Sequence, residues 1–588
     1  MKQNIFRRKT VENILKEAAE GHTDAHGVST MNKVLGVRDL TFMGIAAIVG
    51  AGIFSTIGKA SFDGGPGIIL LFLFVSVACG FSALCYAEFA SMVPVSGSAY
   101  TYSYVAFGEV IAWIIGWDLL MEYAIGNIAV AISWSDYFTS LLNGFGLHIP
   151  DFLTMDYWTA KAMASPEAKA AWLNAPTIGG LRIICDLPAF LITVVITWVI
   201  YIGIKESKRS TNAMVILKMA IILLVLIAGA FYVQPANWEP FLPNGIGGVL
   251  TGTSAVFFSY IGFDAISTTA EECRNPQRDL PKAMFNSLII CTVVYVAIAL
   301  VLTGMVSYKQ LNVGDPMAFV FLAMHSQYAN YIAGIVSVSA VIATASVLLV
   351  FQLGQPRIWM SMSRDGLLPP IFARIHPKYK TPSFSTILTG LLVGIPALFL
   401  NLQVVVDLTS VGTLFAFVLV CGGILRLQQQ RKKAEHLKGA DVITEHGDKE
   451  LVPESKFKIT YINGKWIVPL MFVAAITLFI KYYPGGLEAF FNFKDDKGVI
   501  AWHTIREKVP YILFGVVFAY TAFLSFTRNF SLVPVLGFLC CTYLLCESGT
   551  SNWERFLIWL VVGLSIYFMY GIKRSKLAAK EQTTIDSQ

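Results

Sequence analysis

The stretch FFSYIGFDAISTTAEE, residues 257–272, is the most informative part of this sequence. It continues an apolar run that begins at Val249, yet Gly262 and Asp264 lie about halfway along that run. Glycine accepts backbone angles that interrupt a helix, and a carboxylate at membrane depth is costly and usually functional. The stretch therefore predicts a membrane helix that is interrupted for a purpose.

The composition is that of a membrane protein. The chain has 588 residues, of which 55% are hydrophobic and 14% are charged, and its mean hydropathy is +0.62. A membrane-spanning helix needs roughly 20 mostly apolar residues, and fourteen segments meet that need. They lie near 39–58, 67–92, 104–130, 187–203, 213–232, 249–269, 284–306, 331–353, 384–400, 404–425, 466–482, 510–526, 531–547 and 553–572. We therefore predict an all-α polytopic membrane protein with no cleavable signal peptide.

Lysine and arginine are distributed unequally between the two sides that these spans define. If the N-terminus is inside, 32 of the 44 lie on inner segments and 11 on outer segments, and Lys218 alone lies within a span. Cytoplasmic loops carry an excess of positive charge. Both termini are therefore predicted to be cytoplasmic, in a protein of the plasma (inner) membrane. The net charge of +6 then reflects topology and does not indicate nucleic-acid binding.

The spans and the polar segments give a predicted domain organisation. It comprises a cytoplasmic segment (1–38), spans one to five (39–232) with an outer loop (143–186) that could form a short surface helix, spans six to ten (249–425), a cytoplasmic linker (426–465), spans eleven to fourteen (466–572) and a cytoplasmic tail (573–588). The nine cysteines form no disulfide framework or metal-ligand pattern, and no catalytic motif occurs. The sequence therefore predicts no enzyme activity, metal or cofactor.

The first and sixth spans are interrupted at corresponding places. The first span, LTFMGIAAIVGAGIFSTIG (40–58), contains Gly44, Gly50 and Gly52, and the sixth contains Gly262. Each opens a block of five spans, so the second block enters the membrane from the opposite side. Broken helices at matching positions of two inverted halves are typical of transporters whose site lies near the bilayer midplane.

The chemistry of a broken helix indicates the kind of substrate. The break exposes unpaired N–H groups at one half-helix start and unpaired carbonyl groups at another half-helix end. The N–H groups suit a carboxylate and the carbonyl groups suit an ammonium, so the zwitterion of an α-amino acid fits both. The alternative is that the glycines serve only close helix packing.

Three motifs carry a resemblance to a known family. They are GIAAIVGAGIF (44–54), FFSYIGFDAISTTAEECRNPQRDLPKA (257–283) and MSRDGLLPPIFARIHPKYKTP (362–382). With them, the chain resembles the cationic amino acid transporter family of the amino acid–polyamine–organocation superfamily. The resemblance implies a fold of five plus five inverted spans with four more appended, and secondary-active amino acid transport.

The resemblance also implies a substrate site. Backbone N–H groups of the first span would bind the substrate carboxylate, and carbonyl groups of both broken spans would bind its amino group. Phe258 would close over the substrate from outside, and Gly262 marks the interruption beside it. The implied carboxylate ligands are Gly50, Ala51 and Gly52, and the implied amino-group ligands lie near Ile48, Phe258, Ser259 and Ile261.

Ionisable residues within spans are functional candidates because each is costly there. Lys218 could extend back to the cytoplasmic interface, or its ammonium could replace a coupling sodium ion and leave proton movement to drive uptake, as in similar proton-coupled members. Glu122, four residues after Asp118 on one helix face, would face the substrate pocket in the family. There it could pair with a cationic side chain of the substrate or hydrogen-bond the substrate amine through water, or it could make a structural hydrogen bond to an unwound helix. Asp264 could cap the half-helix after the break or serve a proton pathway.

The eighth span places Thr344 in the implied side-chain pocket, where its small size would favour a longer, cationic substrate. Several bacterial members of the family prefer small neutral amino acids, so the substrate class stays open. The predicted function is proton-coupled amino acid symport by alternating access, with the amino acid, protons and membrane lipid as partners. The alternatives are an uncoupled facilitator or exchanger of cationic amino acids and a non-transporting amino acid sensor.

Overall fold

The structure is a computed structural model of the chain. It describes residues 6–9, 14, 22–24, 27–29, 35–93, 98–203, 208–379, 381–436, 442–443, 449–450, 457–482, 490–493 and 502–578. Most of the predicted N-terminal segment (1–38), much of the predicted linker (426–465) and the end of the predicted tail (573–588) therefore lie outside the described residues.

Long apolar helices dominate the described part of the chain. Eight are long and apolar enough to cross a membrane, and four shorter apolar helices accompany them. The eight are Gly52–Met92, Glu109–Gly144, Asn212–Ala230, Pro276–Met305, Gln327–Arg364, Leu402–Lys432, Thr504–Arg528 and Thr550–Ala578, and the shorter ones are Leu187–Tyr201, Ser383–Ala397, Ile467–Lys481 and Leu532–Glu547. The chain is thus a polytopic helical membrane protein, and the total of fourteen spans stays a prediction.

Both predicted interruptions occur in the structure. Helix α2 (Val37–Ile48) ends at Val49, and the chain resumes as a π-helix (Gly52–Thr56) followed by α3 (Ile57–Gly64). In the second half, α11 (Gly245–Thr251) and α12 (Thr253–Phe258) are followed by a non-helical stretch at 259–263 and then by a 3₁₀-helix (Asp264–Glu272).

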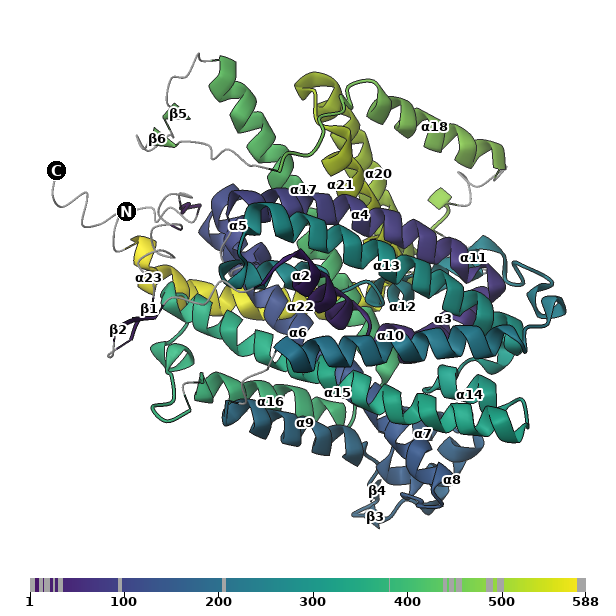
Figure 1. Ribbon diagram of the computed structural model, residues 1–588. Coiled ribbons are helices and arrows are strands. Elements are labelled where there is room, and N and C mark those ends of the chain that lie inside the picture. Colours follow the sequence, from purple (N-terminus) through teal and green to yellow (C-terminus); the bar gives the residue numbers. More distant parts are fainter. Residues whose placement is uncertain are drawn as a thin grey trace.

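The remaining helices of the two predicted halves pack in pairs. Helix α4 (Ile68–Met92) lies along α13 (Pro276–Met305), α6 (Glu109–Gly144) along α15 (Gln327–Arg364), and α9 (Leu187–Tyr201) along α16 (Ser383–Ala397) (Figure 1). Each pair joins a helix of the first half to the helix five places later. Helix α10 (Lys208–Ala230) contacts α2, α13 and α15, and α17 (Leu402–His436) contacts α6 and α12.

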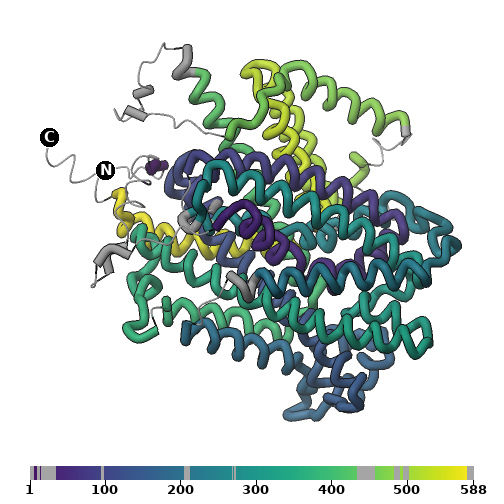
Figure 2. Tube along the Cα trace, in the orientation of Figure 1, coloured from purple at the N-terminus to yellow at the C-terminus, as the bar shows by residue number. Residues whose placement is uncertain are grey.

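The C-terminal helices attach to this bundle at two places. Helix α21 (Leu532–Glu547) packs on α17 and α4, while α22 (Thr550–Ile566) packs on α17 and α6. A π-helix (Tyr567–Gly571) and α23 (Ile572–Arg574) continue α22. Helices α18 (Ile467–Tyr482) and α20 (Trp502–Arg528) contact each other and lie at the edge of the molecule (Figure 2).

The third predicted span (104–130) differs from the helix found. Helix α5 (Ser98–Ala106) ends early, and α6 begins at Glu109 and continues to Gly144. Gly108 lies between them with φ 100°, a left-handed conformation that other residues avoid. A side chain at Gly108 would also approach the backbone oxygen of Phe6 to 2.6 Å.

The predicted outer loop (143–186) contains two short helices where one was expected. They are α7 (Tyr157–Ala162) and α8 (Pro166–Asn174), followed by the antiparallel strands β3 (Thr177–Ile178) and β4 (Leu181–Arg182). Asp156 caps α7 by accepting hydrogen bonds from the N–H groups of Trp158 and Thr159 at 2.9 and 3.0 Å. The other strands are β1 (His22–Asp24) with β2 (Gly27–Ser29), and β5 (Val442–Ile443) with β6 (Lys449–Glu450). Helix α14 (Pro316–Leu322) precedes α15.

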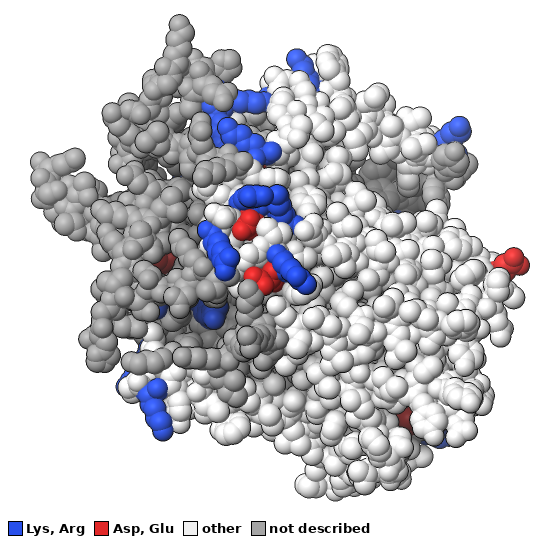
Figure 3. Space-filling view, in the orientation of Figure 1, with Lys and Arg blue, Asp and Glu red and all other residues white. Residues whose placement is uncertain are grey.

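Charged side chains are distributed unevenly over the surface. On the face shown in Figure 3, most of the coloured lysine, arginine, aspartate and glutamate residues gather toward one end, and a wide band beside them carries almost none. Large apolar side chains such as Leu70, Val77, Ile216 and Val293 are exposed on the long helices. An apolar belt of this kind is the surface that lipid covers.

Candidate functional site

The two helix interruptions touch each other through glycines. A Cβ atom at Gly52 would lie 2.4 Å from the Cα of Ser259, and one at Gly262 would lie 2.9 Å from the carbonyl carbon of Ala47. Gly262 also has φ 116°. The hydroxyl of Thr56 joins the two segments, since it donates to the carbonyl oxygens of Gly52 (2.9 Å) and Ala255 (3.2 Å). Glycine is required here both for close approach and for the backbone angle.

A cavity opens at this junction. The space in it that the centre of a water molecule can occupy is about 10 Å³, so in this structure the cavity has room for about one water molecule. The lining residues come from both interruptions and from α6, α15 and α17: Ala47, Ile48, Gly50, Ala51, Gly52, Glu122, Gly126, Val130, Phe258, Ile261, Val347, Phe351 and Thr409. Ala51 is the residue just before the π-helix. The first N–H groups of a helix have no partner within it, so the cavity lies at backbone donors suited to an anion.

The end of α2 provides the opposite polarity. Its last carbonyl groups have no partner further along the helix, and side chains from other helices bind them. The hydroxyl of Tyr295 on α13 donates to the Ile48 oxygen at 2.9 Å. The ammonium of Lys218 on α10 donates to the oxygens of Ala46 and Val49 at 3.2 and 3.3 Å. Lys218 is only 1% exposed, so its ammonium lies at the break and not at the membrane surface.

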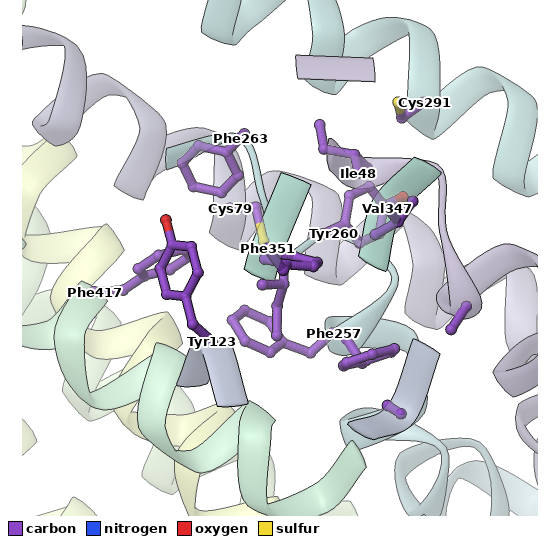
Figure 4. Close-up of a cluster of buried hydrophobic side chains, with 14 of the residues drawn as sticks. Ile48, Cys79, Tyr123, Phe257, Tyr260, Phe263, Cys291, Val347, Phe351 and Phe417 are labelled. Atoms are coloured by element: carbon purple, nitrogen blue, oxygen red, sulfur yellow. The ribbon is translucent and has the colours of Figure 1, made fainter. Parts of the chain in front are cut away.

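The wall of the cavity opposite Gly50 is apolar. The Cγ atoms of Val347 lie 3.3 Å from the position that a Cβ at Gly50 would occupy. The ring of Phe351, one turn along α15, makes an edge-to-face contact with Tyr123 at a centroid distance of 5.6 Å. Figure 4 shows Ile48, Tyr123, Val347 and Phe351 within one buried apolar cluster.

Two carboxylates on α6 lie at or near the cavity. Glu122 lines it, is 3% exposed, and its Oε2 has no hydrogen-bond partner among the described residues. Asp118, one turn earlier, is fully buried, and neither of its oxygens has a partner in the same part of the chain. A Cβ at Gly412 would approach Asp118 Oδ1 to 2.7 Å, so α17 passes close to it. Burying a carboxylate oxygen without a hydrogen-bond partner is costly, so this face of α6 is a candidate for a functional role.

Asp264 follows the second interruption directly. Its side chain is 3% exposed, and the backbone N–H groups of Gly262 and Ala265 hydrogen-bond to its carboxylate. Its Oδ1 has no partner among the described residues. This arrangement satisfies N–H groups freed by the break, as a cap does.

The structure brings together most, but not all, of the predicted site residues. Seven of them line the cavity: Ile48, Gly50, Ala51, Gly52, Glu122, Phe258 and Ile261. Ser259, Gly262, Lys218 and Asp264 lie in or against the interruptions behind it. Thr344 does not line the cavity, and its hydroxyl donates to the Ala340 oxygen of its own helix at 2.7 Å. Val347 and Phe351 form the apolar wall of this cavity, and a role for Thr344 in the side-chain pocket stays a prediction.

Sequence reasoning missed several lining residues. Gly126 follows Glu122 by four residues and therefore shares its helix face, so spacing could have found it. Val347 follows Thr344 by three residues and could have been found in the same way. Val130 and Thr409 gave no signal, because an apolar residue and a threonine within a span are ordinary.

Aromatic side chains fill the space between the cavity and the end of α4. Phe417 on α17 packs against Phe257, Phe263 and Tyr86 at centroid distances of 5.8, 5.1 and 5.4 Å. One turn further, Phe89 stacks on Tyr102 of α5 at 5.0 Å. Figure 4 shows the Phe263 and Phe417 rings near each other. These rings form a packed aromatic cluster that joins α4, α5 and α17 to the second interruption.

Comparisons with known proteins agree with this architecture. The amino acid permease family profile matches residues 35–519, and a profile for the C-terminus of such permeases matches residues 531–575. The branched-chain amino acid permease of Bacillus subtilis is 36% identical over 98% of this chain and 100% of its own length. The methylthioribose transporter of the same organism is 42% identical over 74% of this chain and 88% of its own length. A vacuolar cationic amino acid transporter of Arabidopsis thaliana is 30% identical over 98% of this chain and 94% of its own length. The chain therefore belongs to the amino acid permease family, within the amino acid–polyamine–organocation superfamily, as its motifs predicted.

Proposed function

We propose that this protein is a proton-coupled amino acid symporter of the plasma membrane that works by alternating access. Its two halves are inverted repeats of five spans, both termini are cytoplasmic, and the four C-terminal spans are appended to them. The packing of α4 on α13, α6 on α15 and α9 on α16 supports the repeat, because each pair joins helices at equivalent positions. The contact between the two interruptions supports a site at the interface of the two repeats.

The substrate zwitterion binds between the two interruptions. Its carboxylate meets the N–H groups at the start of the π-helix, at Gly50, Ala51 and Gly52. Its ammonium meets carbonyl groups near Phe258, Ser259 and Ile261, together with the Ile48 carbonyl that already accepts from Tyr295. Phe258 lies at the cavity and is 7% exposed, so a small movement of its ring would cover a bound substrate.

The contact of Lys218 with the end of α2 carries the coupling proposal. Carbonyl groups at the end of a broken transporter helix are typical ligands of a coupling sodium ion. Here a fixed ammonium occupies two of them, which supplies the positive charge without sodium. A lysine held in this way can release and regain a proton. Proton release would remove the charge that strengthens the hydrogen bonds to the Ala46 and Val49 carbonyls and so weaken the hold on the end of α2, which couples the proton to the broken helix.

We infer that the preferred substrate is a neutral amino acid with a short aliphatic side chain. The wall facing the side chain consists of Val130, Val347 and Phe351, and a hydrophobic pocket favours an apolar group of matching size. One observation favours a second candidate, a cationic amino acid: Glu122 Oε2 lines the same cavity and has no partner among the described residues.

Uptake into proteoliposomes tests the proposal. Labelled isoleucine, alanine and arginine are each supplied with an imposed inward proton gradient and again with the gradient collapsed by an ionophore. The proposal predicts accumulation of isoleucine or alanine only with the gradient. Arginine accumulation that is lost in Glu122→Gln would select the second candidate. Equal uptake with and without the gradient would favour a facilitator or exchanger. Specific binding of an amino acid without uptake would favour a sensor.

A further inference from the structure

Residues 6–9, here called the strap, cross the end of the bundle at which α6 begins and α15 ends. Arg7 lies 3.7 Å from Glu109 at the start of α6, and its carbonyl oxygen accepts a 2.8 Å hydrogen bond from the Glu109 N–H. Lys9 forms a 2.6 Å ion pair with Asp365, directly after α15. Arg7 and Glu109 are both buried. The strap thus closes this end by binding two carboxylates on α6 and after α15.

The segment after α22 binds the same two residues, Glu109 and Asp365. The Tyr567 hydroxyl donates to Glu109 Oε1 at 2.9 Å, and the Ser575 hydroxyl hydrogen-bonds to Glu109 Oε2. The Lys576 N–H donates to the Asp365 carbonyl oxygen at 3.1 Å. Gly366, with φ 81°, lies so close that a Cβ there would be 2.3 Å from the Arg574 oxygen.

Tryptophans of α6 fix α22 in this position. Trp117 and Trp559 stack at 4.5 Å, and each ring N–H donates to the other residue's carbonyl oxygen, at 2.9 and 3.1 Å. The Trp113 ring N–H donates to the Gly563 oxygen at 2.9 Å. Gly563 permits this approach, since a Cβ there would lie 2.3 Å from Trp117. The π-helix at Tyr567–Gly571 follows directly and presents Tyr567 to Glu109.

The two ion pairs of the strap, Arg7 with Glu109 and Lys9 with Asp365, are called the seal. We propose that Tyr567 and Ser575 are positioning residues of the seal, because they hold the Glu109 carboxylate in the orientation in which it binds Arg7. When the strap leaves, Glu109 loses its cation inside the protein. A buried carboxylate without partners is costly and would turn or draw in other groups. Two hydroxyl donors from the C-terminal segment keep it satisfied and oriented, so the strap can return to an unchanged acceptor. The appended C-terminal spans thereby take part in closing the transport pathway.

The inference rests on the proposed alternating access, because only a transporter that opens at this end needs a seal that re-forms. The double variant Tyr567→Phe with Ser575→Ala removes both hydroxyls and little else. Hydrogen–deuterium exchange of the purified full chain reports the seal directly, since the Glu109 N–H is protected by the Arg7 carbonyl. We expect exchange in peptides covering Glu109 to be on the order of tenfold faster, while α22 peptides stay protected. In uptake, kcat is expected to fall and KM for the amino acid to stay unchanged.

The matched control is Tyr570→Phe with Ser565→Ala, which makes the same chemical changes on the same segment away from Glu109; the Ser565 hydroxyl donates only within its helix, to Val561. Unchanged exchange at Glu109 in the double variant would overturn the proposal. If α22 also loses protection in the double variant, the single variants Tyr567→Phe and Ser575→Ala are measured. If neither single variant speeds exchange at Glu109, the proposal is overturned. The exchange measurement needs neither substrate nor gradient, so its failure is distinct from a failure of proton-coupled transport.

Discussion

The ammonium of Lys218 lies 3.3 Å from the carbonyl oxygen of Val49, the residue at which the first broken helix ends. The same ammonium binds the Ala46 oxygen at 3.2 Å. A single side chain from α10 thus holds the last turn of α2, directly behind the cavity that Ile48, Gly50 and Ala51 line. A substitution at Lys218 therefore removes a contact of the first interruption itself.

Alanine at the touching glycines is predicted to abolish transport. Gly52→Ala places a Cβ 2.4 Å from the Ser259 backbone, and Gly262→Ala adds the strain of φ 116°. Such clashes and strain cost about 1–3 kcal/mol each, enough to separate the two interruptions even where the protein still folds. Gly334→Ala and Gly515→Ala are the matched controls, since a Cβ at either has no neighbour within 4 Å. Uptake that survives Gly52→Ala at the level of these controls would contradict the account.

Shortening the apolar wall is predicted to change substrate preference. Val347→Ala removes two methyl groups that face Gly50 across the cavity, so the KM for a longer aliphatic amino acid should fall relative to that for alanine, by about 10-fold at most for a change of this size. Thr344→Ala serves as the control, because that hydroxyl is bound within its own helix. Competition of unlabelled amino acids against labelled isoleucine measures the ratio. A larger change in Thr344→Ala than in Val347→Ala would return Thr344 to the pocket.

Much of the site could be predicted from glycines and charges. The interruptions at Gly50–Gly52 and Gly262 could be predicted because these glycines fall at matching positions of two spans. Lys218 could be predicted because an ammonium within an apolar span is costly. The contact between the two interruptions could not be predicted, because it depends on how two helices that are distant in sequence cross. That Val347 lines the cavity and Thr344 does not depends on the rotation of α15, which a pattern of small residues on one face does not fix.

The sequence also could not predict how the C-terminal helices attach to the bundle. Trp117 and Trp559 are 442 residues apart, and their reciprocal hydrogen bonds depend on Gly563, which looks like any packing glycine. Likewise, the sequence pattern did not predict that α6 continues to Gly144. Contacts of this kind are set by tertiary packing and not by local composition.

Stability is predicted to depend on pH through Asp186, which precedes α9 in the outer loop. Burial raises the pKa of this carboxyl to about 7, although hydrogen bonds from Ser135 and the Ala189 N–H oppose the shift. The pKa in the unfolded chain is about 4, so between these values the folded state binds more protons and stability falls as the pH rises. Asp186→Asn keeps an acceptor oxygen and lacks the titration.

Thermal unfolding in detergent at pH 5 and pH 8 measures this effect. The wild-type protein should lose more stability on going to pH 8 than Asp186→Asn does. Asp151→Asn, in the same loop but more exposed, should follow the wild type. The same loss in Asp186→Asn as in the wild type would show that this carboxyl does not contribute.

Uptake by Lys218→Ala tests the central claim most directly. The variant and the wild type are reconstituted with an imposed inward proton gradient, and exchange of labelled substrate between equal internal and external pools is measured in parallel. Lys169→Ala, on the exposed face of α8, is the matched control. The account predicts that Lys218→Ala loses gradient-driven accumulation and retains exchange, while Lys169→Ala keeps both. Accumulation by Lys218→Ala equal to that of the wild type would contradict it and show that the ammonium at Val49 has no part in proton coupling.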